Sequence, residues 1–309
     1  MSRNEQRHGF NEDSETLALL RSPPSEAALA WASESVGAVV DRWEVLRGGM
    51  SSAMYVVAFS GEPPVELVLR CYVRADLNRE EPDLAVRESA ALRAASAAEI
   101  PTPELVAVDP MGERVGVPAL LMTRLAGRVV WDPTGVDGWL QRLAEVLPAV
   151  HAVESGHEPV GVYENYAQES YAPPKWATKT AIWERAAEVF HGPILDEVRC
   201  FIHRDYHPGN VLWKRGHVTG VVDWQSACIG PPSVDIGHCR ANFLGYAPEL
   251  ADRFTGFAEE ALGTQFHPWA DIAALIGMLD GLRYRPPRLA GREAIEAAVE
   301  HAVAALTRP

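Results

Sequence analysis

The chain of 309 residues contains few lysines, and all of them lie in its second half. They are Lys175, Lys179 and Lys214, so every strong cation before residue 175 is an arginine. Asp and Glu outnumber Lys and Arg by 42 to 28, which gives a formal net charge of −14. Because nucleic acids and anionic membranes are bound through clustered positive charge, this composition argues against both as partners.

Cysteine is also scarce, and long apolar runs are absent. The four cysteines (Cys71, Cys200, Cys228 and Cys239) are scattered, without the close pairs of a redox or zinc motif, which predicts reduced, structural thiols. No stretch approaches the roughly 20 apolar residues of a membrane span, and the first residues lack the apolar core of a secretory signal. We therefore expect a cytoplasmic protein, and nothing in the sequence implies a protein partner.

The first part of the chain is rich in predicted strands. A polar segment over residues 1–24 is expected to be mobile, and a helix over 25–40 begins at Ser25 as its cap. Apolar and β-branched runs then predict strands, and an alanine-rich run predicts a helix that is stopped by prolines. The strands span 43–47, 53–59, 65–73, 105–110 and 118–125, and the helix spans 84–100.

The second part has a different pattern. Helical periodicity covers 137–154, 180–198, 267–284 and 291–306, with a loop-rich interval over 200–237 between them. A strand-rich part joined to a helical part predicts an α+β chain in two lobes. The expected N-lobe spans 25–124 around a small antiparallel sheet, and the larger helical C-lobe spans 125–309.

Chemically competent side chains gather between residues 200 and 238. Asp205, Asn210 and Asp223 lie among short apolar runs, together with His203 and His207, which is typical of a site set at strand ends. Phosphoryl transfer needs a carboxylate to orient the attacking hydroxyl and oxygen ligands for a hard cation. In this interpretation Asp205 accepts the hydroxyl proton, while Asn210 and Asp223 hold Mg²⁺.

The upstream part offers the other half of such a site. A glycine turn joins the first two predicted strands and continues into two serines, whose backbone N–H groups suit phosphate oxygens; it comprises Gly48, Gly49, Ser51 and Ser52. Arg70 on the third strand supplies a cation, and Glu88 on the next helix is its natural charged partner.

With these residues the sequence resembles the aminoglycoside phosphotransferases, which have a protein-kinase-like fold. The resemblance depends on His203-Arg204-Asp205, on Asn210 five residues later, on Asp223 thirteen further on, and on the trailing pattern that contains Asp235. It implies a nucleotide-binding N-lobe and a C-lobe with the catalytic loop and acceptor site. It also implies catalysis by Asp205, magnesium on Asn210 and Asp223, and ATP as donor, with Met122 and Leu125 in the segment that meets adenine. Asp235 matches an aspartate that braces the catalytic loop.

Two departures from that family bear on the function. Its relatives carry a lysine on the third strand, where this chain has Arg70, and arginine grips phosphate as a bidentate fork. Only eleven residues separate Asp223 from Asp235, which leaves no room for the activation segment of a protein kinase. The sequence therefore predicts a small-molecule hydroxyl acceptor, such as an antibiotic or a metabolite.

Two alternatives stay open at this stage. One is an inactive kinase-like module that binds nucleotide without turnover. The other is a metal-dependent hydrolase, because His203, Asp205 and His207 alternate and would share one face of a strand.

The charge distribution of the second part bears on the acceptor class. The stretch 241–282 holds six acidic residues (Glu249, Asp252, Glu259, Glu260, Asp271 and Asp280) against Arg253 alone, a local excess of five negative charges. If that stretch builds the acceptor site, a cationic acceptor such as an aminoglycoside follows as a hypothesis, with a solvated acidic helix face as the alternative.

Overall fold

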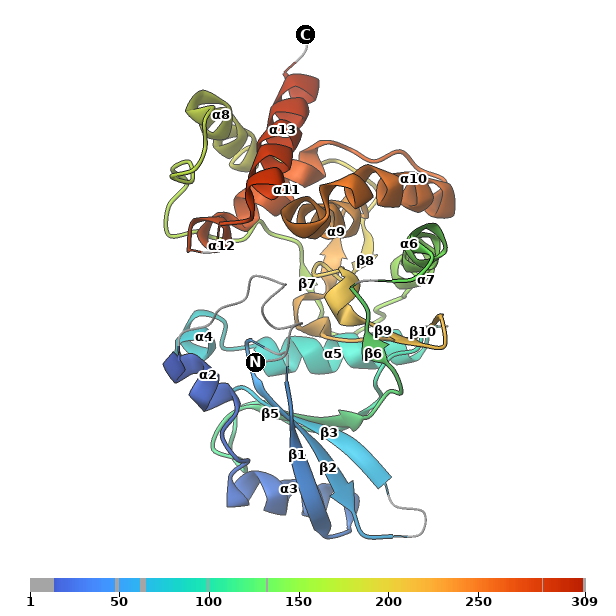
Figure 1. Ribbon diagram of the computed structural model, residues 1–309. Coiled ribbons are helices and arrows are strands. Elements are labelled where there is room, and N and C mark those ends of the chain that lie inside the picture. Colours follow the sequence, from blue (N-terminus) through green and yellow to red (C-terminus); the bar gives the residue numbers. More distant parts are fainter. Residues whose placement is uncertain are drawn as a thin grey trace.

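A computed structural model describes residues 14–47, 50–61, 65–98, 100–131, 133–284 and 286–307. It has two lobes stacked end to end, with a twisted sheet in one and a helical bundle in the other (Figure 1). The prediction of an α+β, protein-kinase-like fold with a small N-lobe and a larger helical C-lobe is confirmed.

The N-lobe is built on an antiparallel sheet of order β1-β2-β3-β5-β4. Its strands and accompanying helices are β1 (Val40–Leu46), β2 (Ala53–Phe59), β3 (Val65–Cys71), β4 (Leu105–Asp109), β5 (Ala119–Thr123), α2 (Ser14–Leu20), α3 (Glu26–Val36), α4 (Ala75–Glu80) and α5 (Leu84–Ser96). The five strands fall where the sequence predicts them.

Helices cover both faces of this sheet. Trp31 of α3 packs with Leu69 and Leu121 on one face, whereas Leu92 of α5 packs with Val68 on the other. This split follows from the period of two along a strand, which sends Val68 and Leu69 to opposite faces. The α5 face continues into the core of the C-lobe, so α5 lies at the junction between the lobes (Figure 1).

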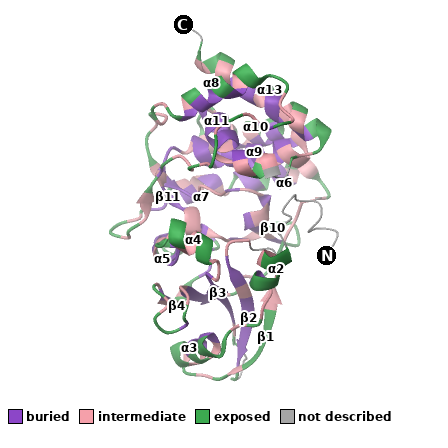
Figure 2. Cartoon of the chain, turned by 90° about the vertical axis from the view of Figure 1, so that its left-hand side faces the viewer, coloured by how far each residue is buried: buried purple, intermediate pink, exposed green. Residues whose placement is uncertain are grey.

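The C-lobe consists mainly of helices around a buried pair, α9 and α11 (Figure 2). Its helices are α6 (Val136–Ala144), α7 (Leu147–His151), α8 (Thr180–Phe190), α9 (Ser233–Tyr246), α10 (Ala251–Leu262), α11 (Trp269–Gly277), α12 (Leu279–Tyr284) and α13 (Leu289–Leu306). At the crossing of α9 and α11, a Cβ on Gly237 would lie 2.5 Å from the Ala270 carbonyl oxygen. Only glycine permits this close approach, which fixes α9 beneath the loop that follows β8 and contains Asp205.

Two small sheets carry that loop. They contain β9 (Val211–Lys214), β10 (His217–Val221) and β6 (Arg128–Val129) in one, and β7 (Gly161–Val162), β11 (Cys228–Gly230) and β8 (Cys200–Ile202) in the other. Short 3₁₀ turns, Pro208–Asn210 and Trp224–Ser226, lie between these strands, and a third precedes α10 at Pro248–Leu250. The chain passes from β5, in the large sheet, to β6, which pairs with β9, between residues 123 and 128.

Several sequence-based boundaries were wrong, each for a local reason. The helix expected over 180–198 ends at Phe190, because Gly192 and Pro193 follow. The helix expected over 25–40 begins after the Ser25 cap, as predicted, but ends at Val36, where Gly37 adopts a left-handed conformation with φ 73°.

Two longer segments also differ from expectation. Of residues 1–24, expected to be polar and mobile, residues 14–20 form α2, and Leu20 is buried. The Tyr55 hydroxyl donates to the Ser22 carbonyl, which ties this segment to the sheet, while residues 1–13 lie outside the described part of the chain. The interval 200–237, expected to be loop-rich, instead contains four strands and the first turns of α9.

The four cysteines are free thiols, and Cys71, Cys228 and Cys239 are buried. Burial raises the pKa of both Cys71 and Cys228 to about 12, so these thiols stay protonated and inert, as predicted. Within the described ranges, no helix has the length and apolarity needed to cross a bilayer.

Candidate active site

Arg70 lies near the end of β3 with its guanidinium buried between the lobes. It shares the sheet face of Val68, two residues earlier, and so points toward α5. Its Nη1 donates to Glu88 Oε1 at 2.6 Å, and the two side chains are only 2% and 1% exposed. The Tyr72 hydroxyl donates to the other Glu88 oxygen. The prediction that Glu88 steadies Arg70 is confirmed.

The same guanidinium joins the two lobes. Its Nε donates to Ser52 Oγ at 2.8 Å and its Nη2 to Ser51 Oγ at 3.1 Å, both within the N-lobe. From the C-lobe, Asp223 Oδ1 accepts from Nη1 at 2.9 Å and Gln225 Oε1 accepts from Nη2 at 3.1 Å. Arg70 therefore connects the serines of the predicted phosphate turn to a predicted magnesium ligand.

The charges around Arg70 keep it ionised. Burial by itself lowers the pKa of the guanidinium, but the negative charges of Glu88 and Asp223 raise it well above its usual value. Within this cluster the side chain of Asp223 is 29% exposed, so one face of its carboxylate is open to a ligand.

Asp223 adopts a strained backbone conformation. Its φ of 68° and ψ of 58° are left-handed, which costs free energy in a residue with a Cβ. Asp223 is the residue at which the 3₁₀ turn Trp224–Ser226 begins. The left-handed conformation there brings the side chains of Asp223 and Gln225 to Arg70. Sequence reasoning missed Gln225, whose only signal was its position two residues after Asp223.

The second group of predicted residues lies in the loop after β8. Asn210 donates from its side-chain nitrogen to the Asp205 carbonyl at 2.9 Å and to Asp205 Oδ2 at 3.0 Å. His238 of α9 holds the other carboxylate oxygen, with Nε2 2.8 Å from Oδ1. Burial by itself raises the pKa of Asp205, but the hydrogen bond from His238, the strongest of the opposing causes, lowers it well below its usual range. Asp205 is therefore ionised and oriented at both oxygens.

Asp235, at the start of α9, braces this loop from below. It is fully buried, and its two oxygens accept from the backbone N–H of His203 at 3.0 Å and of Arg204 at 2.7 Å. His151 Nε2 lies 3.0 Å from Asp235 Oδ2. Two adjacent N–H groups held by one carboxylate fix the backbone immediately before Asp205, as the resemblance implied.

The three alternating residues of the hydrolase alternative do not form a metal cluster. His203 Nε2 lies 3.0 Å from the Val222 carbonyl, and its ring packs on Trp224. His207 Nδ1 accepts from the Gly209 N–H at 3.0 Å. In the described part of the chain, no group of three or more His, Cys, Asp or Glu side chains is arranged to hold a metal ion. This geometry gives the hydrolase no support.

The other described residues predicted to bind the nucleotide do not contact Arg70 or Asp205 through a hydrogen bond. Met122 is a buried core residue of β5, paired across the sheet with Val68. Leu125 lies in the linker between the lobes and packs on Gly220 of β10. Gly48 and Gly49 lie outside the described residues.

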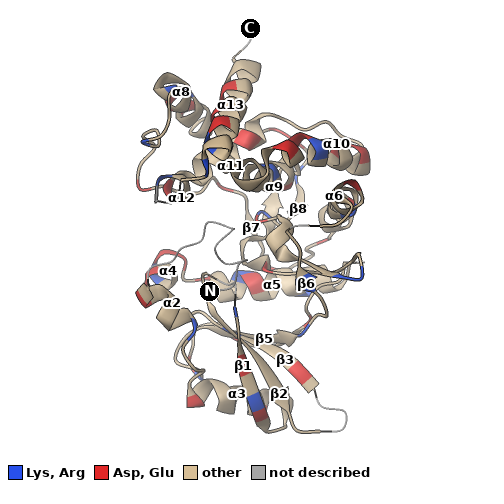
Figure 3. Ribbon diagram, in the orientation of Figure 1, with Lys and Arg blue, Asp and Glu red and all other residues tan. Residues whose placement is uncertain are grey.

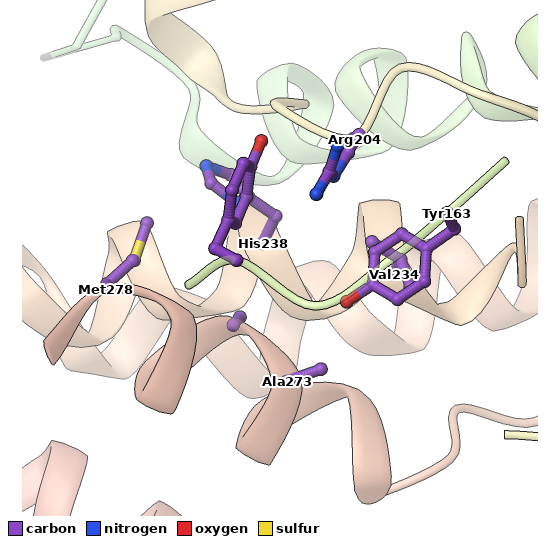
Figure 4. Close-up of a pocket in the computed structure, with 8 residues that line it drawn as sticks. Tyr163, Arg204, Val234, His238, Ala273 and Met278 are labelled. Atoms are coloured by element: carbon purple, nitrogen blue, oxygen red, sulfur yellow. The ribbon is translucent and has the colours of Figure 1, made fainter. Parts of the chain in front are cut away.

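A small pocket lies within the C-lobe, next to the loop that contains Arg204 (Figure 4). It is lined by Tyr163, Tyr166, Arg204, Val234, His238, Ala273, Ala274 and Met278. His238 belongs both to this lining and to the partners of Asp205. Sequence reasoning assigned no chemical role to Arg204.

The stretch 241–282 contributes Ala273, Ala274 and Met278 to this pocket but none of its acidic residues, and part of its negative charge is paired inside the fold. Asp271 is 2% exposed and pairs with Arg240 at 2.9 Å, and Arg240 also contacts Asp252 at 3.1 Å. Asp280 pairs with Arg283 at 2.8 Å. Arg240 and Arg283 lie just outside the stretch that was counted. Along α10, Arg253 is the one basic residue among acidic ones (Figure 3). The three paired carboxylates therefore give no support for a cationic acceptor.

Comparison with known proteins gives a family match and one curated relative. Residues 42–270 match the family model described as the phosphotransferase enzyme family. The uncharacterized protein YcbJ of Bacillus subtilis (strain 168) is 29% identical over 185 residues, so the match spans only 55% of this chain and 55% of that relative.

Solved structures with the same fold include enzymes with different acceptors. A thermostable mutant of aminoglycoside phosphotransferase APH(4)-Ia, in ternary complex with ADP and hygromycin B, is 19% identical, with a TM-score of 0.61 over 91% of this chain and 99% of that one. Macrolide 2'-phosphotransferase MphH from Brachybacterium faecium is 17% identical, with a TM-score of 0.56 over 89% and 98%. Amicoumacin kinase hAmiN, in complex with AMP-PNP, Ca²⁺ and Ami, is 16% identical, with a TM-score of 0.56 over 99% and 96%.

At these identities the structural likeness concerns the fold. The family match, which covers most of the chain, agrees with the order and spacing of Asp205, Asn210 and Asp223 and with the two-lobed architecture. This chain belongs to the phosphotransferase enzyme family.

Proposed function

We propose that the protein transfers the γ-phosphoryl group of ATP to a hydroxyl of a small molecule, with Mg²⁺ as cofactor. One observation carries the proposal: Arg70 of the N-lobe contacts Asp223 of the C-lobe at 2.9 Å, in the same chain in which Asp205 is held by Asn210 and His238. A buried cation, a partly open carboxylate and an oriented carboxylate are the groups that phosphoryl transfer needs. The solved relatives that hold ADP or AMP-PNP support a nucleotide donor.

The donor atoms fit a hard cation. Asn210 uses its NH₂ group toward Asp205, so its amide oxygen is the atom that a magnesium ion would take, alongside the open face of Asp223. Magnesium commonly takes only one or two protein ligands and completes its shell with water and phosphate oxygens. When bound, the ion would neutralise charge on the transferred phosphate.

The residues of the chain have separate tasks in the proposed reaction. Asp205 orients the acceptor hydroxyl and takes its proton as the oxygen attacks the γ-phosphorus; the bond from that phosphorus to the β-phosphate oxygen breaks, and ADP leaves. His238 and Asn210 hold the Asp205 carboxylate in place. Arg70, steadied by Glu88, offers the phosphates a cation that is already ionised and buried.

Transfer of labelled γ-phosphate from ATP to a panel of hydroxyl compounds tests the function. We expect Mg²⁺-dependent transfer to at least one compound. Nucleotide binding without transfer across the panel would instead favour the inactive module, and hydrolysis without ATP would favour the hydrolase.

The metal site has its own test. Asp223→Ala is expected to abolish the magnesium dependence of nucleotide binding, measured by calorimetry with and without the metal. Unchanged dependence would contradict the proposed metal role of Asp223. Asp137→Ala is the matched control, because that carboxylate is paired with Arg253 on the surface and lies outside the site.

A further inference from the structure

The pocket beside Asp205 contains an arginine with an unused donor. Tyr166 and Tyr163 face the Arg204 guanidinium, with ring centroids 3.9 Å and 5.3 Å from Cζ. Nη2 donates to the Glu164 carbonyl at 2.6 Å. Nε is buried and has no hydrogen-bond partner among the described residues. A buried N–H without a partner costs free energy, which a ligand oxygen would recover.

The backbone at Arg204 is also constrained. Its φ of 66° is left-handed, and its N–H donates to Asp235 at 2.7 Å. Residues in such strained conformations persist only where the surrounding contacts hold them, and they are common at active sites and ligand-binding sites. Here the conformation directs Arg204 into the pocket from the residue immediately before Asp205 (Figure 4).

The other walls select further against a cation. The remaining lining side chains are tyrosines, His238 and apolar groups, so none of the eight is acidic. Burial raises the pKa of Tyr166 and of Tyr163, which keeps both phenols uncharged. Arg204 is thus the fixed charge of the pocket, and Ala273, Ala274 and Met278 form an apolar floor opposite it.

The size and position of the pocket define what it could hold. Its volume is about 10 Å³, which is room for one group about the size of a water molecule. His238 links it to Asp205 through a contact of 2.8 Å. A group in the pocket would therefore sit beside the hydroxyl that Asp205 orients.

We propose that this pocket binds an oxygen atom of the acceptor, a carboxylate, carbonyl or second hydroxyl adjacent to the reacting hydroxyl, and that it rejects an ammonium group there. The proposal rests on the proposed function and narrows its acceptor class. An oxygen would accept from Arg204 Nε, whereas an ammonium offers only donors and carries the same sign of charge as the guanidinium. The acceptor is then neutral or anionic next to its reacting hydroxyl.

Direct binding of three matched probes tests the proposal. Glycolate, ethane-1,2-diol and 2-aminoethanol share a hydroxymethyl group and differ in the neighbouring group. Their affinities for the full chain with AMP-PNP and Mg²⁺ are measured by ligand-observed NMR. We expect the Kd of both oxygen compounds to be lower than that of 2-aminoethanol by a factor of about ten or more. One hydrogen bond to a charged group has an effect of this size. The affinity of glycolate relative to that of ethane-1,2-diol then shows whether the pocket prefers an anionic or a neutral acceptor.

Two variants assign the binding to the pocket. Arg204→Lys keeps the charge but removes Nε, and Ala274→Leu fills the cavity; each is expected to weaken the oxygen probes about tenfold or more. Arg185→Lys, on the exposed face of α8, is the matched control and should change nothing. AMP-PNP binding reports whether each variant is folded.

Some results would overturn the proposal. They are tighter or equal binding of 2-aminoethanol, no binding of either oxygen probe, or oxygen-probe binding unaffected by both Arg204→Lys and Ala274→Leu. Because binding is measured without turnover, the expected order and its loss in the variants support the proposal even if no compound is phosphorylated. Failure of the proposed function is thereby distinguishable from failure of the pocket.

Discussion

Arg70 and Arg204, the two arginines of the candidate active site, differ in how their side chains are paired. Arg70, in the proposed nucleotide site, uses all three nitrogens, with acceptors from both lobes. Arg204, in the proposed acceptor pocket, donates from its side chain to a carbonyl and leaves Nε without a partner in the described structure. A fully paired buried arginine acts on a ligand through its charge, whereas one with an unused donor can also give the ligand a direct hydrogen bond.

The largest expected effect is on turnover, and it comes from Asp205 rather than from either arginine. Asp205→Asn keeps the shape of the side chain but removes the proton acceptor, so turnover should fall by about 10²–10⁴-fold. Binding of AMP-PNP and of the oxygen probes should change little, since neither Arg70 nor Arg204 is altered. Steady-state rates and calorimetry check the two halves separately; near-normal turnover would refute the role of Asp205.

The contrast between the two arginines is tested by stability. Arg70→Ala leaves Glu88 buried without its partner and should lower the free energy of unfolding by about 3–5 kcal/mol. Arg204→Ala should lower it by only about 1 kcal/mol, because one hydrogen bond and the tyrosine contacts are lost. Urea unfolding of both variants measures these free energies. Equal losses would contradict the proposed difference between Arg70 and Arg204. Arg70→Lys, which keeps the charge but not the fork, should fall between wild type and Arg70→Ala.

A smaller effect depends on pH. Burial lowers the pKa of His207 from 6.5 to about 4, so the ring is neutral in the fold and takes up a proton more readily when unfolded. The unfolded state therefore binds more protons between these values, and stability falls as pH drops from 6.5 toward 4, by about 2 kcal/mol. His207→Gln should flatten that part of the stability curve, measured by urea unfolding at a series of pH values. An unchanged slope would contradict a buried neutral His207.

The smallest effect concerns the contact between the lobes. Gln225→Ala removes the hydrogen bond that Gln225 Oε1 accepts from Arg70 and the contacts of the Gln225 amide with Ser51 Oγ, and should cost about 1 kcal/mol in unfolding. It should also loosen the predicted phosphate turn and raise the Kd for AMP-PNP several-fold. Gln141→Ala, on the exposed surface of α6, is the control, because that amide donates to Glu145 on the same helix. Identical nucleotide affinity in the two variants would make Gln225 dispensable.

Much of the framework could be predicted from the sequence because it depends on local patterns. Apolar and β-branched runs located β2 and β3, and the Ser25 cap located the start of α3. Element ends were less predictable, as at Phe190, because a helix extends only as far as its caps and packing allow.

The acidic stretch shows why counting charges in a window fails. Six acidic residues against Arg253 suggested a cation-binding surface. In the fold, Arg240 binds Asp271 from a position thirty-one residues earlier, and Asp280 pairs with Arg283. Such pairs form between residues that are close in space, whatever their distance along the chain, so composition alone could not separate a ligand surface from a set of structural ion pairs.

The sequence by itself determined the family and the order of the reactive residues, from Arg70 and Glu88 to Asp205, Asn210 and Asp223, because spacing and residue type are linear properties. It also determined that the strand cation is an arginine, since no lysine precedes residue 175. Only the tertiary structure decided that Gln225 joins Arg70, that His238 holds Asp205, and that Arg204 enters a pocket. These contacts join segments of different lobes or of separate helices and loops, and side-chain partners of that kind exist only once the core has brought the segments together.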